Sequence, residues 1–125
     1  MKAIQTNNAP GAIGPYSQAI EVGNLVYTSG QLPINPATNA FPEGGVKEQT
    51  RQSLLNIQAI LQERGLSMRN VVKTTVFMAD MNDFAEMNNV YAEFFAEPYP
   101  ARSAVAVKTL PKNALVEIEV VAEIG

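Results

Sequence analysis

The sequence predicts an α+β fold, a single domain in which two helices pack on one face of a mixed β-sheet. The first observation is the order of segments, because the apolar period alternates between that of a strand and that of a helix as β-β-α-β-α-β-β. The second is length, since 125 residues without an internal repeat or a Pro/Ser-rich linker suit one domain, here residues 1–125. The third is a strand that is apolar on both faces.

The first half of the chain predicts a hairpin, a loop and a helix. Residues 19–22 and 25–29 flank Gly23-Asn24, a two-residue connection typical of a tight hairpin. Residues 31–45 contain three prolines and two glycines and predict a loop. The next segment predicts a helix that ends at Gly65, with its apolar residues on one stripe: Val46, Leu54, Ile57, Ile60 and Leu61.

The second half predicts three strands and another helix. Residues 71–79, VVKTTVFMA, are apolar on both faces, so we expect this strand to be covered twice. A helical stripe follows, with Asp80 or Asn82 as N-cap and an end near Glu97-Pro98; it consists of Phe84, Met87, Tyr91 and Phe95. Strands at 102–107 and 116–124 complete the sheet. Helices on one face and apolar residues on the other predict burial against another subunit.

Composition limits the chemistry. There is no cysteine and no histidine, so a general base must be Asp, Glu, Lys, Tyr or a terminus, and a metal site would need carboxylates alone. The net charge of −3 and scattered basic residues disfavour nucleic acid as a partner. No apolar run resembles a signal peptide or a membrane span, so we expect a cytoplasmic protein. Phosphate-loop, dinucleotide-binding, nucleophile-elbow and zinc motifs are absent from the sequence.

Two charged residues are candidates for a site, and each has a structural alternative. Arg102, in YPARSAVAV, is a permanent planar cation that matches a carboxylate, but it could also be solvated or paired with a glutamate. Glu117 alternates with core residues on an acidic strand face, where a solvated edge is the simpler interpretation.

Three further candidates are also ambiguous when taken singly. Tyr16 follows a turn and could line a pocket or pack its ring with a solvated hydroxyl. Gly30 could allow a ligand to approach the backbone or serve strand geometry only. Asn88 lies four residues after Phe84 and three before Tyr91, so its amide falls on or beside the apolar stripe.

Several stretches together resemble the Rid/YjgF family of small enamine/imine deaminases, over essentially the whole chain. They are APGAIGPYSQAI, YTSGQLPINP, VVKTTVFMADMNDFAEMNNVYAEFF, YPARSAV and LPKNALVEIEVVA. The resemblance implies a fold like that of small chorismate mutases and a homotrimer with clefts between subunits. It also implies hydrolysis of 2-imino or 2-enamino acids, such as 2-aminoacrylate, 2-iminopropanoate and 2-iminobutanoate, to 2-keto acids and ammonia, without a cofactor. Such an activity would protect pyridoxal-phosphate enzymes from damage.

The resemblance also implies roles for individual residues. Arg102 matches the arginine that binds the substrate carboxylate, and Glu117 matches the acid that positions or activates water. Tyr16, Gly30 and Asn88 match positions that line the cleft, with Ser29 beside Gly30.

One departure from the family pattern is Ala104, where many members have a cysteine. It argues against a thiol-based role but leaves hydrolysis unaffected. Two other functions stay open: a non-catalytic regulator that binds carboxylate metabolites, and a chaperone-like oligomer. Retention of both Arg102 and Glu117 favours the enzyme, because a regulator has no need of an acid that handles water.

Overall fold

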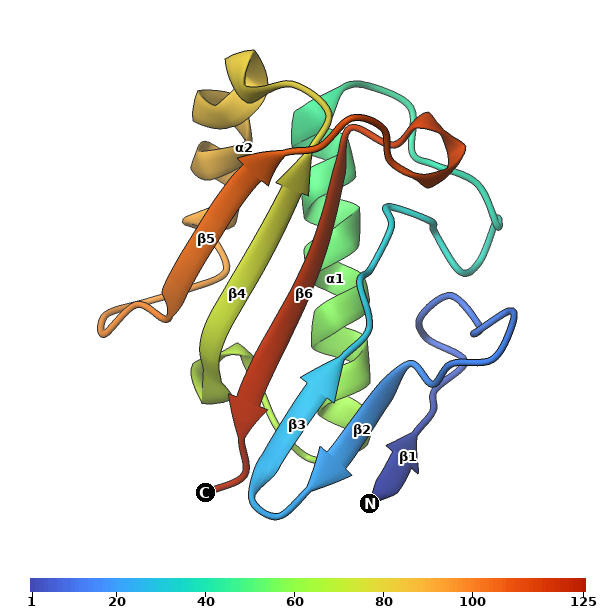
Figure 1. The fold of residues 1–125 in the computed structure, drawn as a ribbon, viewed down its shortest axis with the longest axis vertical. Helices are drawn as coiled ribbons and strands as arrows, with labels where there is room; N and C mark the ends of the chain where they lie inside the picture. The colour runs from blue at the N-terminus through green and yellow to red at the C-terminus, as the bar shows by residue number, and fades with distance from the viewer.

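The structure, a computed structural model, describes all of residues 1–125 and contains one six-stranded sheet and two α-helices (Figure 1). Along the sheet the strands follow the order β1-β2-β3-β6-β4-β5. The elements are β1 (Lys2–Ile4), β2 (Ala19–Val22), β3 (Leu25–Thr28), α1 (Val46–Glu63), β4 (Val71–Met78), α2 (Phe84–Tyr91), β5 (Ala101–Ala106) and β6 (Val116–Glu123), with short 3-10 helices η1 (Met68–Asn70), η2 (Met81–Asp83) and η3 (Pro111–Asn113).

The sheet is mixed, and both α-helices lie on one of its faces, as the sequence predicts (Figure 1). Neighbouring strands are antiparallel except β4 and β5, which run parallel with the α2 segment as their crossover. The strand β1 is the one strand the sequence does not predict. It has three residues and pairs only with β2, so its sequence is too short to show an alternating pattern.

Local signals explain where α1 begins and ends. At its start the Gly45 amide donates a hydrogen bond to the Glu48 carboxylate at 2.8 Å. At its end Gly65 has a φ of 79°, and the amides of Gly65 and Leu66 donate to the carbonyls of Gln62 and Leu61. This is a Schellman motif, which confirms Gly65 as the residue that ends the helix.

The second helix is shorter than the sequence predicts. The stripe predicts a helix continuing to about Glu97, but α2 ends at Tyr91 and Phe95 lies beyond it. Asp80 acts as a cap, though for η2: its carboxylate accepts a hydrogen bond from the Asn82 amide at 2.9 Å. The chain therefore turns into α2 through a short 3-10 segment, without a side-chain cap on α2 itself.

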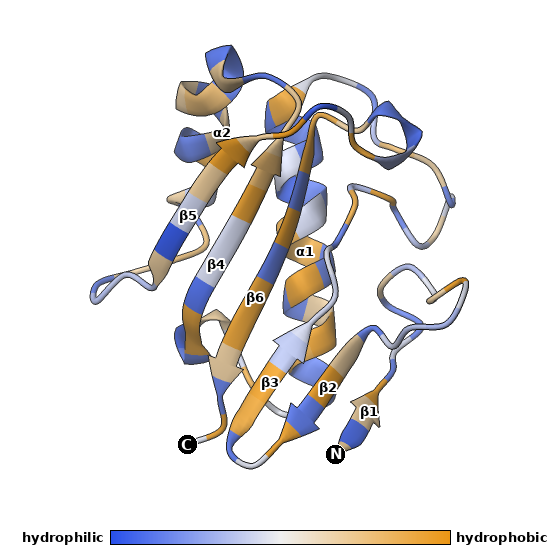
Figure 2. Cartoon of the chain, in the orientation of Figure 1, coloured by the Kyte–Doolittle hydropathy of each residue, from blue (hydrophilic) through white to orange (hydrophobic).

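The core lies between the sheet and the helices. Along β6 every second residue is buried on the helix face, and the alternation of apolar and polar residues along this strand is visible in Figure 2. The largest fully buried apolar side chains include Leu54, Ile57, Ile60, Leu61, Met78, Met87 and Ile118. This face-specific burial fixes the register of β6 and so also fixes which way its acidic residues point.

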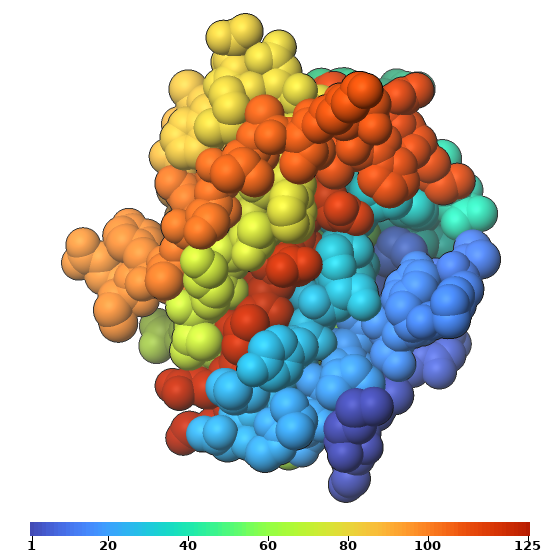
Figure 3. All heavy atoms as spheres, in the orientation of Figure 1, coloured from blue at the N-terminus to red at the C-terminus, as the bar shows by residue number.

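The opposite face, called here the open face, has no helix over it. Figure 3 shows side chains of β3, β4 and β6 at the surface there. Tyr27 and Val105 on this face are 46% and 47% exposed, and Phe77 is only partly buried. The prediction that β4 is covered twice is therefore not met within one chain. No helix in the structure combines the length and the apolar character needed to cross a membrane.

Candidate functional site

The strand register places the two charged candidates on opposite faces of the sheet. Arg102 on β5 pairs with Thr74 on β4, and Thr74 pairs with Val120 on β6, so these side chains project to the helix face. Glu117 lies three residues from Val120 on the same strand and therefore projects to the open face. One chain on its own does not bring Arg102 and Glu117 together.

On the helix face, Arg102 lies against α2. Its Nη1 donates a hydrogen bond to Asn88 Oδ1 at 2.6 Å. Its guanidinium carbon lies over two aromatic rings, 4.7 Å from the centroid of Tyr91 and 5.3 Å from that of Phe84. We call these four residues the Arg102 cluster. Because Phe84, Asn88 and Tyr91 are four and three residues apart, one side of the helix presents all three to β5.

Tyr91 is fixed in turn by contacts with Thr74 and Phe95. Its hydroxyl is hydrogen-bonded to Thr74 Oγ1 at 2.8 Å, and its ring packs against Phe95 with centroids 4.5 Å apart. Thr74 is fully buried and Tyr91 is 6% exposed. Burial raises the pKa of Tyr91, so the phenol stays protonated at neutral pH.

Arg102 has no acidic partner in the chain. The two ion pairs of the structure lie elsewhere, between Arg51 and Glu93 at 2.8 Å and between Arg64 and Glu21 at 2.6 Å. Within one chain, Arg102 therefore lacks the structural glutamate partner that the sequence left as an alternative. A single bond to a neutral amide leaves the positive charge uncompensated and leaves further N–H donors for a ligand.

On the open face, Glu117 packs directly on Gly30. A Cβ built on Gly30 would lie 2.9 Å from Glu117 Cδ and 3.0 Å from Oε2, closer than ordinary van der Waals contact. The absence of a side chain at position 30 is thus what leaves room for this carboxyl group. The alternative of a solvated edge is wrong, because β6 lies between β3 and β4 and Glu117 is half-buried.

Ser29 adjoins Gly30 in the chain, and Tyr16 is linked to Ser29 through its neighbour Ser17. The Ser29 hydroxyl donates to the Ser17 carbonyl at 2.6 Å, and the Ser29 amide donates to the Gln18 carbonyl. Tyr16 precedes this bonded segment; it is 53% exposed, and its hydroxyl accepts from the Ile13 amide at 3.3 Å. We call Tyr16, Ser29, Gly30 and Glu117 the Glu117 cluster.

The surroundings of Glu117 favour its neutral form. Burial raises the pKa of its carboxyl group, and the charge of Glu119, two residues along the same strand face, raises it further. A carboxyl group with a raised pKa is suited to accept and return a proton near neutrality. No group of three or more acidic side chains converges closely enough to hold a metal ion.

The sequence did not identify the aromatic part of the Arg102 cluster as part of a site. Phe84 and Tyr91 are apolar stripe residues, and nothing in their pattern distinguishes rings that cover a guanidinium from rings that fill a core. Their spacing from Asn88 was the available signal. The contact itself depends on the pairing of β4 with β5, whose residues lie far apart in the sequence.

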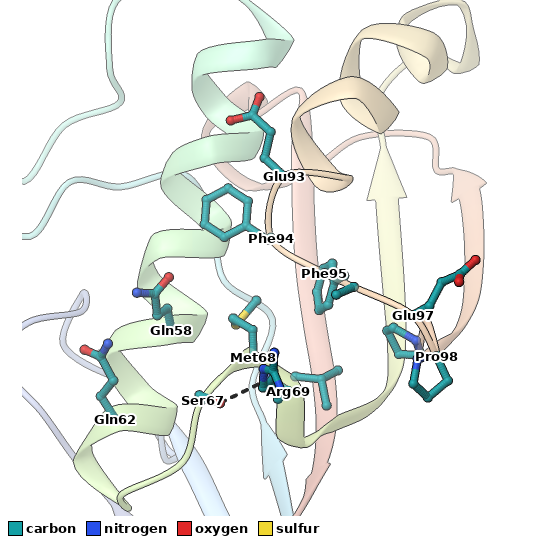
Figure 4. A pocket seen from close by; sticks show the side chains of 13 residues that line it. Gln58, Gln62, Ser67, Met68, Arg69, Glu93, Phe94, Phe95, Glu97 and Pro98 are labelled. Carbon is teal, nitrogen blue, oxygen red and sulfur yellow. Dashed lines mark hydrogen bonds between the residues drawn. The ribbon is translucent and has the colours of Figure 1, made fainter.

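A groove of the chain lies away from both clusters. It has a volume of about 510 Å³ and lies between α1, η1 and residues 93–100 (Figure 4). Gln58 and Gln62 border it on one side, and Phe94 and Phe95 on the other. It contains none of the six predicted site residues, so the candidate site of one chain consists of two open clusters and not of an enclosed pocket.

The fold and these clusters define a small single-domain α+β protein with an unpaired arginine at the sheet edge and a half-buried glutamate on the open face. The chain belongs to the Rid/YjgF family: residues 6–124 match the family model described as endoribonuclease L-PSP. It is 51% identical over 124 residues to the 2-iminobutanoate/2-iminopropanoate deaminase of Escherichia coli K12, covering 97% of this chain and 96% of that protein.

Solved structures agree with this assignment. The crystal structure of the E. coli YjgF gene product is 50% identical, with a TM-score of 0.93 and 98% of each chain covered. The crystal structure of E. coli TdcF with bound serine is 48% identical, again with a TM-score of 0.93 and 98% of each chain covered. Together they confirm the predicted fold class.

Proposed function

We propose that this chain assembles as a homotrimer and hydrolyses 2-imino and 2-enamino acids to 2-keto acids and ammonia. The observation that carries the proposal is the uncompensated charge of Arg102. Its guanidinium donates a 2.6 Å hydrogen bond to the neutral Asn88 amide and forms no ion pair with a carboxylate of the same chain. A planar cation in this state is matched to the carboxylate that every 2-imino acid carries. Because imines hydrolyse readily in water, the reaction would need no cofactor.

The two clusters would meet across a subunit contact. Arg102 and Glu117 project from opposite faces of one sheet, so a substrate held by Arg102 of one protomer needs the Glu117 cluster of another. The partly apolar open face, with Tyr27 and Val105 exposed, supplies a surface that such a contact would bury. In the assembled cleft, Arg102 and Asn88 would hold the carboxylate while Tyr16, Ser29 and Gly30 line the opposite wall.

The chemistry would be a single addition and elimination. The Glu117 carboxylate accepts a proton from water as its oxygen bonds to C2, and the electrons of the C=N double bond move to nitrogen. Glu117 then returns this proton to nitrogen, which gives an intermediate with a hydroxyl and an amino group on C2. As the C=O bond forms, Glu117 takes the hydroxyl proton and passes it to nitrogen, so the C2–N bond breaks and nitrogen leaves as ammonia. Water and imine thus become keto acid and ammonia. Orientation by Arg102 and one proton relay suffice, because imines hydrolyse readily without help.

The relatives support this function over the alternatives. One relative is named a 2-iminobutanoate/2-iminopropanoate deaminase, and another was crystallised with serine, an amino acid whose carboxylate suits the same guanidinium. The family description names an endoribonuclease. A net charge of −3 and the lack of histidine do not favour RNA cleavage by this chain.

A coupled assay tests the proposal. A serine or threonine dehydratase generates the imine, a scavenging amine competes for it, and the release of ammonia or keto acid is followed with and without this protein. We expect acceleration that Arg102→Ala abolishes and Glu117→Gln weakens, with both variants folded by circular dichroism. Clearing the imine in this way would protect pyridoxal-phosphate enzymes.

The same assay separates the two other functions. A regulator would bind 2-keto acids through Arg102, seen as ligand-dependent thermal stabilisation, but would not accelerate hydrolysis. A chaperone-like oligomer would be indifferent to both substitutions and would suppress aggregation of other proteins. Either pattern would contradict the proposed hydrolysis.

A further inference from the structure

We propose that Tyr91 is a positioning residue for Arg102, whose ring, anchored by Thr74, sets the plane of the guanidinium for the ligand carboxylate. This inference rests on the proposed carboxylate-binding role of Arg102. It assigns a function to two buried residues that would otherwise count only as core.

The geometry of the cluster constrains the guanidinium in two ways. The Asn88 amide oxygen fixes one N–H of Nη1 at 2.6 Å, within the plane of the group. The rings of Tyr91 and Phe84, at 4.7 and 5.3 Å, lie against its face. A planar ion held by one in-plane bond and by contacts to its face has little freedom to rotate, so its remaining N–H donors keep one direction.

The anchor of the Tyr91 ring is rigid. Thr74 belongs to β4, the strand that pairs with β5 directly beside Arg102, and its side chain is fully buried. Its 2.8 Å hydrogen bond to the Tyr91 hydroxyl links α2 to the sheet at Thr74, the residue paired with Arg102 across the two strands. Since the hydroxyl is buried and makes its bond with Thr74, it is not available to a ligand.

Preorganisation of this kind affects ligand affinity. An arginine on a solvated edge strand loses side-chain freedom when it binds a carboxylate, and that loss weakens binding. With the plane already set, this loss is smaller. Removing the Tyr91 ring also removes a cation–π contact, so we expect the Kd for a 2-keto acid to rise about 3- to 30-fold.

The experiment compares Tyr91→Leu with two other variants, using 2-oxobutanoate as the probe and the assembled protein. Tyr91→Phe keeps the ring and loses the bond to Thr74, so its Kd should lie between those of the unmodified protein and Tyr91→Leu. Phe95→Leu is the matched control, because Phe95 packs on Tyr91 with centroids 4.5 Å apart but its ring does not lie against the Arg102 guanidinium. It should lower the melting temperature while leaving Kd within about twofold of the unmodified protein.

Two readouts separate positioning from a purely structural role. In the coupled assay, Tyr91→Leu should raise KM by the same factor as Kd with little change in kcat. In proton–nitrogen NMR spectra, the Arg102 Nε–H resonance, assigned by its loss in Arg102→Lys, should move toward its random-coil position in Tyr91→Leu but not in Phe95→Leu. An unmoved resonance, or equal Kd values for the two leucine variants, would overturn the inference.

The outcomes also distinguish this inference from the proposed function. If the unmodified protein binds 2-oxobutanoate without accelerating imine hydrolysis, the function fails, and the resonance and the Kd series still decide the role of Tyr91. If hydrolysis is accelerated and Tyr91→Leu changes neither KM nor the resonance, the function stands and the positioning role is wrong.

Discussion

Replacing Gly30 by alanine should lower the activity strongly while leaving the fold intact. The backbone of Gly30 does not require a positive φ, so alanine can adopt it. The new methyl group, however, would lie 2.9 Å from Glu117 Cδ and 3.0 Å from Oε2. Ordinary contact begins at 3.4 Å, so the carboxyl group must move by about 0.5 Å or more.

The expected magnitudes follow from that displacement. Because the obstructing atoms are the end of a flexible side chain, the stability cost should be at the low end of overpacking, about 1 kcal/mol. The effect on chemistry should be larger, since a misplacement of about 1 Å costs up to about 100-fold in rate. We therefore expect kcat to fall about 10- to 100-fold with a small change in KM, because Arg102 is untouched.

The assay is the coupled imine hydrolysis, together with urea unfolding of five proteins: the unmodified protein, Gly11→Ala, Gly30→Ala, Glu117→Ala and the Gly30→Ala/Glu117→Ala double variant. Gly11→Ala is the matched control, since a Cβ there meets nothing within 4 Å. In a Glu117→Ala background the obstruction is gone, so Gly30→Ala should then cost almost no stability. Full activity of Gly30→Ala, or an equal stability cost with and without the Glu117 side chain, would refute the contact and its role.

Three further predictions concern single substitutions. Burial raises the pKa of Glu117, so its ionised form destabilises the folded protein relative to the unfolded chain at pH 7. Glu117→Gln removes this charge and should raise the free energy of unfolding at pH 7. The gain should vanish below about pH 4, where glutamate is protonated in the unfolded chain as well. Urea titrations across this range would contradict it if the gain grew on acidification. Asn88→Asp places a carboxylate at the 2.6 Å contact, where it would pair with Arg102 and compete with the ligand carboxylate. Calorimetry should show 2-oxobutanoate binding weakened at least about tenfold, with no fall in the melting temperature. Unchanged affinity would mean that the ligand does not bind this guanidinium. Val105→Lys puts a charge on the exposed open face of β5 and should yield folded, inactive monomers in analytical ultracentrifugation; an intact oligomer would place the subunit contact elsewhere.

Strong local patterns made much of the fold predictable from the sequence. The alternation along β6 determined both the burial of Ile118 and the direction of Glu117, because a strand with one buried face has one stable register. The left-handed Gly65 at the end of α1 was predicted for the same local reason. The strand β1 and the early end of α2 were missed, since three residues carry no period and helix ends are set by tertiary contacts.

The face on which Arg102 lies could not be predicted. Its strand carries small residues on both sides, Ala101 and Ser103 on one and Ala104 on the other, so no alternation selects a register. A shift of one residue would have placed Arg102 on the open face, the face that carries Glu117. The parallel pairing with β4 decides the matter, and that pairing joins segments separated by an entire helix.

A mixing experiment tests most directly whether one active cleft takes Arg102 and Glu117 from different protomers. Arg102→Ala and Glu117→Gln proteins, each of low activity alone, are dissociated, mixed in equal amounts and reassembled. If each cleft draws these residues from two chains, about one site in four should be intact, and activity should return to roughly that fraction of the unmodified protein. No recovery in mixed oligomers would mean that both residues act from the same chain, which would contradict the arrangement proposed for this site.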